Sequence, residues 1–168
     1  MKNILFVSIL FIGLYGCADP KRNPTPSATK TDTLVITTPV EAEKLLQFTP
    51  EFTARFALED WKELMDFKRD FENLKRLNPK GLSLFLRGLE RQCRTVLRGK
   101  FPEPFDQNPI KSRLKVVLTE VMQAQYFAEN KQNAALEESL KKMYAAYTIF
   151  LERIISTGEA ESLTTGEE

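Results

Sequence analysis

The fold is decided by residues 133–156, NAALEESLKKMYAAYTIFLERIIS. Six large apolar side chains recur there at alternating spacings of four and three residues: Leu136, Leu140, Met143, Tyr147, Phe150 and Ile154. This spacing is typical of a helix that packs along other helices, as in a coiled coil. The stretch therefore predicts one long helix with a single continuous apolar side.

Three earlier stretches show the same helical periodicity, over residues 51–77, 80–99 and 109–129. Their apolar stripes are Ala57, Trp61, Leu64, Phe67, Phe71 and Leu74; then Leu82, Phe85, Leu86, Leu89, Cys93, Val96 and Leu97; then Ile110, Leu114, Val117, Leu118, Val121 and Ala128. Short connections between amphipathic helices favour antiparallel neighbours. We therefore predict an all-α protein, an up-down bundle of about four amphipathic helices.

Three pairs of residues indicate where helices begin. Thr49-Pro50, Asn78-Pro79 and Asn108-Pro109 each place a capping side chain before a proline. A proline is tolerated in the first turn because its missing N–H would have no partner there. Residues 157–168 contain Gly158, Gly166 and four glutamates, and they are expected to form an acidic tail outside the bundle.

The N-terminal stretch has the pattern of a bacterial lipoprotein signal. Lys2 precedes an apolar run over residues 4–14, which is shorter than the roughly 20 residues of a spanning helix. The run ends in Leu14-Tyr15-Gly16-Cys17, an aliphatic residue three before a cysteine and a small residue just before it. Tyr15 is bulkier than is usual at that position. An ordinary secretory signal and an uncleaved anchor are the alternatives.

These patterns divide the chain into four parts. Residues 1–16 are predicted to be a lipoprotein signal peptide, and residues 17–45 a lipidated Cys17 followed by a flexible linker rich in Pro, Thr and Ser. Residues 46–156 form the helical bundle domain, and residues 157–168 the tail. The membrane is thus an expected partner, through acyl chains on Cys17, because two or more chains give stable anchoring.

The composition excludes several kinds of active site. The sequence contains no histidine, which removes Ser-His and Cys-His nucleophile systems and makes a zinc site improbable. Its net charge is +1, and no aromatic residue is interleaved with the arginines of residues 87–98, so nucleic acid is not an expected partner. Cys93 is expected to be a small buried residue, with a redox or metal role as the alternative. We predict no catalytic residue, no metal and no cofactor.

The clearest surface feature is a set of four arginines, which we call the arginine stripe. Arg87, Arg91, Arg94 and Arg98 are spaced by four, three and four residues. At about 100° per residue they lie within about 60° of one another, away from the apolar stripe of the same helix. Guanidinium groups bind phosphates and carboxylates well, so this stripe is a candidate site for an anionic partner. The alternative is a solvated face that binds nothing.

Two segments resemble parts of small helical lipoproteins of Bacteroidota-type bacteria that have no assigned activity. They are Asn78-Pro79-Lys80-Gly81-Leu82 and Phe101-Pro102-Glu103-Pro104-Phe105-Asp106, followed by Pro109 to Leu114. The resemblance covers about residues 55–150 and implies a helical envelope lipoprotein without a catalytic residue. The second segment is otherwise expected to be a stiff corner whose phenylalanines are buried, with a recognition loop as the alternative.

These observations favour a non-enzymatic, membrane-tethered binding or scaffold module of the bacterial envelope. Attachment to the outer membrane on its periplasmic side is the preferred location. The first alternative is a carrier that holds a lipid or small apolar ligand in the bundle core, which would need a cavity of roughly 300 Å³ or more. An enzyme of another kind is the distant alternative.

Overall fold

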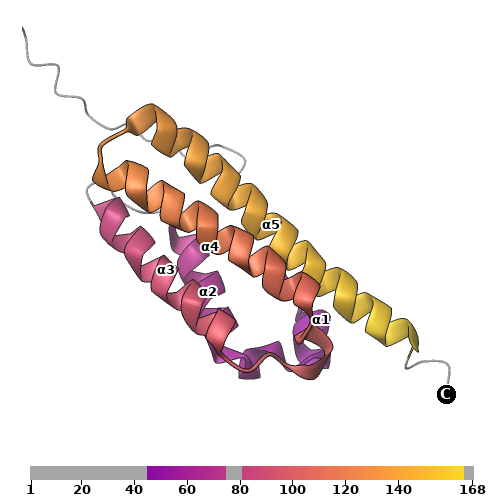
Figure 1. Cartoon of the computed structure of the whole chain (residues 1–168). Helices are drawn as coiled ribbons and strands as arrows, with labels where there is room; N and C mark the ends of the chain where they lie inside the picture. The colour runs from indigo at the N-terminus through magenta and orange to yellow at the C-terminus, as the bar shows by residue number, and fades with distance from the viewer. Residues whose placement is uncertain (1–44, 75–80, 165–168) are drawn as a thin grey trace, which may run out of the picture. The chain divides into compact units, whose positions relative to one another are not determined.

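The bundle consists of four successive helices, each antiparallel to the next (Figure 1). The computed structural model describes residues 45–74 and 81–164, which belong to one unit of the chain. The four helices are α2 (Lys62–Asn73), α3 (Leu82–Arg98), α4 (Asn108–Glu129) and α5 (Asn133–Thr164). The short helix α1 (Pro50–Arg55) and the 3-10 turn η2 (Leu58–Asp60) precede them, and η5 (Glu103–Phe105) joins α3 to α4. The described ranges contain no strand, so the predicted all-α bundle is confirmed.

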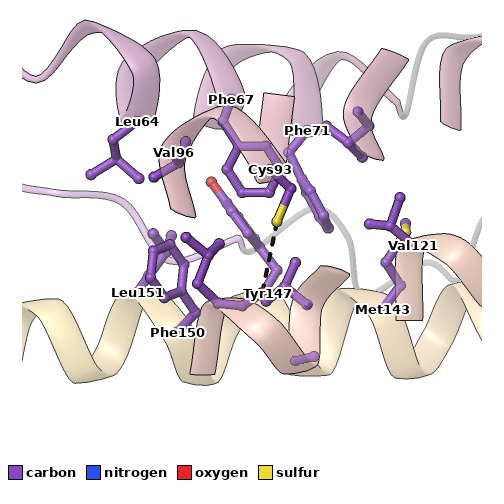
Figure 2. Packing of buried hydrophobic residues seen from close by; sticks show 14 of the residues in the cluster. Leu64, Phe67, Phe71, Cys93, Val96, Val121, Met143, Tyr147, Phe150 and Leu151 are labelled. Carbon is purple, nitrogen blue, oxygen red and sulfur yellow. Dashed lines mark hydrogen bonds between the residues drawn. The ribbon is translucent and has the colours of Figure 1, made fainter. Parts of the chain in front are cut away.

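The predicted apolar stripes meet in one continuous core. Helix α4 packs closely on both α3 and α5, and α3 packs on α2. Aromatic rings fill the side between α2 and α5, where Phe71 stacks on Tyr147 with ring centroids 3.9 Å apart (Figure 2). Phe67 meets the same tyrosine edge to face, at 6.0 Å. The long helix predicted from residues 133–156 thus provides one wall of the core.

The prediction of a single first helix over residues 51–77 is wrong, because the helix is interrupted at Ala57. This residue has a left-handed conformation, with φ 45° and ψ 42°, and it is exposed instead of lying in the core. On an unbroken helix Leu58 would lie about 180° from Phe67, nine residues away, and would face solvent. The break turns Leu58 into the core, where it is fully buried. Residues 75–77 lie outside the described ranges.

The predicted boundary at residue 156 is also wrong, because α5 continues to Thr164. Gly158 is buried against α1, and a Cβ there would lie 2.7 Å from a ring carbon of Phe52 and 2.8 Å from one of Phe56. Farther along, Arg55 Nη1 donates to Ser162 Oγ at 3.0 Å. These contacts with α1 hold residues 157–164 in the helix, and the remaining tail residues lie outside the described ranges.

The three predicted helix starts have different outcomes. Thr49 is the N-cap of α1, and its Oγ1 accepts a hydrogen bond from the Phe52 N–H at 3.1 Å, as predicted. Asn108 is already helical, and the preceding Gln107 is the N-cap, without a side-chain capping bond. The Gln107 carbonyl accepts the first helical bond, from the Lys111 N–H at 3.1 Å, so the predicted cap is one residue too late. Asn78-Pro79 lies outside the described residues.

Candidate functional site

Helix α3 forms one edge of the bundle (Figure 1). The arginine stripe lies on the side of α3 that faces away from the core. The opposite side carries five buried residues, the core stripe: Leu82, Leu86, Leu89, Cys93 and Val96. Arg87, Arg91 and Arg98 are exposed, and Arg94 is partly exposed. The predicted face assignment is therefore confirmed, although whether these residues bind a partner stays a prediction.

Two of the four arginines are held by neighbouring side chains. Arg87 Nη2 lies 2.7 Å from Glu129 Oε1 on α4. Arg94 is paired within its own helix, with Nη2 2.8 Å from Glu90 Oε1, and it also approaches the Met122 sulfur on α4 at 3.3 Å. Both ion pairs lie near solvent, where such pairs contribute little to folding stability. They fix the orientation of these two guanidinium groups.

Arg91 and Arg98 form no ion pair or side-chain hydrogen bond with any residue in the described ranges. Helix α3 carries four arginines and one glutamate, which gives it a net charge of +3. Arg98 lies in the last turn, where a positive charge is favoured by the helix dipole. The stripe therefore presents two unpaired and two oriented guanidinium groups on one exposed face.

The contact between Arg87 and Glu129 gives a direct pH prediction. The hydrogen bond from Arg87, followed by one from Gln125 at 3.0 Å, lowers the pKa of Glu129. Arg87→Gln should raise that pKa toward its ordinary value, whereas Arg91→Gln, which removes no contact with Glu129, should leave it unchanged. A carbon NMR titration of the side-chain carboxyl groups measures both. The contact stabilises the fold above the ordinary carboxyl pKa, and this contribution is lost as the pH falls through the lowered pKa. An unchanged Glu129 pKa in Arg87→Gln would contradict the pairing.

A groove of about 410 Å³ runs between α2 and α3, beside the arginine stripe. We call it the α2–α3 groove; its lining residues are Asp70, Leu84, Phe85, Gly88, Leu89, Arg91, Gln92 and Thr95. Gln92 Nε2 donates to Asp70 Oδ2 at 2.5 Å across its floor, while Gln92 Oε1 is buried without a partner. Sequence reasoning missed this groove. Its available signals were a glycine in the middle of a helix and Leu84 off the core stripe.

A second groove of about 580 Å³ follows the break between α1 and α2. Its walls include Phe48, Ala57, Met65 and the acidic pair Glu59 and Asp60. Lys68 also lines this groove and forms an ion pair there, with its Nζ 2.6 Å from Glu72 Oε1. Both grooves open on solvent, so neither is the enclosed internal cavity that the carrier hypothesis requires.

Cys93 lies inside the core, where it was predicted to be a small buried residue (Figure 2). Its Sγ donates weakly to the Leu114 carbonyl at 3.7 Å. Burial raises the pKa of the thiol to about 12, so the thiolate that redox and metal chemistry need is absent at neutral pH. The predicted burial is confirmed.

The corner between α3 and α4 is built from aromatic residues, as predicted. Phe101 and Phe105 are buried, and both pack against Trp61, with centroids 4.9 and 6.2 Å from its ring system. Trp61 was predicted to be a core residue and is also buried. The corner therefore fixes the path of the chain, and its aromatic side chains are not presented to a ligand.

Comparison of the chain with protein-family models, curated proteins and solved structures found no match. Within residues 45–74 and 81–164, no group of three or more Cys, Asp or Glu side chains is placed to hold a metal ion. No helix in those ranges is both long enough and apolar enough to cross a membrane. Cys17 lies outside the described residues, so its lipidation stays a prediction.

Proposed function

We propose that the protein is a non-enzymatic binding or scaffold module of the bacterial envelope, tethered to a membrane through lipid on Cys17. Support for the tether comes from the lipobox pattern of residues 14–17 and from the resemblance to small helical lipoproteins. The preferred location is the periplasmic side of the outer membrane. In this arrangement the residues after Cys17 connect the bundle to the membrane.

The single observation that carries the binding role is the unequal pairing within the arginine stripe. Arg87 and Arg94 are oriented by Glu129 and Glu90, whereas Arg91 and Arg98 have no partner in the described ranges. An anionic component of the envelope that contacts this face would meet fixed and free guanidinium groups side by side. Such groups bind carboxylates and phosphates in a bidentate manner, which gives orientation as well as attraction.

The binding role predicts a loss of contact without a loss of fold. Changing Arg87, Arg91, Arg94 and Arg98 to Gln should abolish binding of the native partner, while each change alters stability by no more than about 0.5 kcal/mol. A photocrosslinking residue at exposed Lys100, two residues after Arg98, would capture the partner in the native envelope. The yield of this adduct should fall as the salt concentration rises during crosslinking, because exposed charges are screened beyond about 8 Å at physiological ionic strength.

The matched control removes the same charge from other exposed positions. Lys62, Arg113, Lys115 and Arg153 lie on α2, α4 and α5, and their change to Gln should leave the adduct intact. If the arginine variant gives the same adduct as the wild-type protein, the stripe is only solvated and the proposal fails. If the arginine variant unfolds, the assignment of the stripe to the outer face is wrong.

A further inference from the structure

Helix α3 carries a second stripe with the same spacing as its core stripe. The core stripe, at residues 82, 86, 89, 93 and 96, is filled by the rest of the bundle. Two residues farther along, the outer stripe repeats the alternation of four and three: Leu84, Gly88, Arg91, Thr95 and Arg98. Alternate spacing of this kind aligns side chains along one side of a helix and is the geometry by which helices pack on each other.

The outer stripe has the shape of a docking surface. Leu84 is 68% exposed, although leucine is more often buried, and it lies at one end of the α2–α3 groove. Gly88 lies in the middle of the stripe, and a Cβ added there would meet no atom within 4 Å. Glycine in a helix interior lowers stability relative to alanine, and no neighbour in the described ranges needs the space that it leaves. The gap at Gly88 therefore admits a side chain from outside.

The charge of the groove selects the kind of partner. Arg91 and Arg98 lie on the stripe without ion pairs in the described ranges, and Arg87 and Arg94 flank it on the side of α4. The one carboxylate in the groove, Asp70, is already engaged by Gln92 and by Arg69 Nε at 3.5 Å. A ligand in this groove thus meets apolar side chains, the gap at Gly88, and the unpaired guanidinium group of Arg91.

We propose that the anionic partner binds α3 through an acidic amphipathic helix that lies along the outer stripe. A small or aliphatic side chain of that helix enters the gap at Gly88, its apolar side covers Leu84, and its carboxylates pair with Arg91 and Arg98. This inference rests on the proposed binding function and names its recognition element. It is a helix-in-groove contact, in which spacing and charge both contribute to selection.

The test uses a synthetic, stapled 18-residue helix with leucine and alanine at four-three spacing and glutamates on both flanks. Its binding to the full chain is measured by fluorescence anisotropy, against a peptide of the same composition with the spacing scrambled. We expect binding at least tenfold tighter for the ordered peptide. Gly88→Leu should weaken this binding at least tenfold by filling the gap, without lowering the thermal unfolding temperature. Gly88→Gln repeats the test with a polar side chain, and Ala145→Leu, on an exposed position of α5, is the control that should bind normally.

The outcomes separate the inference from the proposed function. If Gly88→Leu keeps the native Lys100 adduct while the fourfold arginine variant loses it, the binding function stands and the helical partner is excluded. Equal binding of the ordered and scrambled peptides would also overturn the inference. Binding of the chain to phosphatidylglycerol vesicles but not to the ordered peptide would overturn the inference as well. A Lys100 crosslink between two copies of this chain would also overturn it, because a second copy would then be the occupant.

Discussion

Replacing Cys17 with serine is expected to release the protein from the membrane fraction or to mislocalise it. A serine hydroxyl does not take the diacylglyceryl group that a thiolate accepts, so the variant would carry no acyl chain. Two acyl chains give stable anchoring, and the bundle turns its large apolar stripes inward onto its own core. Fractionation of native envelopes measures the shift, and mass spectrometry of the peptide that begins at Cys17 detects the lipid directly.

The chain supplies its own control for this experiment. Cys93→Ala removes the other cysteine, whose thiol is buried in the core, and it should leave the protein membrane-bound. The lipoprotein interpretation is wrong if the Cys17→Ser protein stays with the membrane through a high-salt wash. It is also wrong if the wild-type peptide carries no lipid.

The long helices could be predicted because their signal is repeated many times along each helix. In α3 and α4 the predicted stripes supply the buried residues, from Leu82 to Val96 and from Ile110 to Val121. Several residues of each stripe support the same helical periodicity, so one residue that departs from it does not change the helix assignment. The buried position of Cys93 followed from its place in this pattern, without any chemical clue.

The break at Ala57 could not be predicted because nothing local marks it. Alanine favours helix and disfavours the left-handed conformation that it adopts here. The conformation is held by long-range packing, which buries Leu58 on one side of the break and seats Phe52 and Phe56 near Phe105 on the other. Gly158 is similar, since a glycine weakens a helix locally, and only α1, about a hundred residues earlier, explains the space that it provides.

The arginine stripe could be recognised in the sequence, but which of its arginines form ion pairs could not. Spacing places four guanidinium groups on one face, whereas the partner of Arg87 depends on where α4 ends at Glu129. The groove beside the stripe depends on the rotation of α2 against α3, which also brings Asp70 to Gln92. The pattern of a single helix carries no information on the rotation of its neighbour. The groove and the ion pairs of the candidate site therefore came from the structure and not from the sequence.

Changing Phe71 to alanine should lower the free energy of unfolding by about 3–5 kcal/mol. This ring is fully buried and stacks on Tyr147 at 3.9 Å, and it forms a T-shaped pair with Tyr144 at 5.4 Å and 89°. The rings fill the side of the core between α2 and α5, so removal leaves a cavity that the helices cannot close. A loss of this size is a large fraction of the 5–15 kcal/mol typical of a domain. Urea unfolding followed by circular dichroism measures it.

Tyr147→Phe is the matched control, because it keeps the stacked ring and removes only a hydroxyl. That oxygen is buried without a hydrogen-bond partner, so its loss should leave stability unchanged or raise it by about 1 kcal/mol. Burial first, and Glu72 second, raise the pKa of Tyr147 well above its ordinary value. The folded protein therefore holds the neutral phenol, and stability is lost as the pH rises above the ordinary tyrosine pKa of about 10. Tyr147→Phe should reduce this alkaline loss, and an unaltered alkaline transition would show that Tyr147 does not cause it. A stability loss as large as that of Phe71→Ala would show that the hydroxyl is hydrogen-bonded.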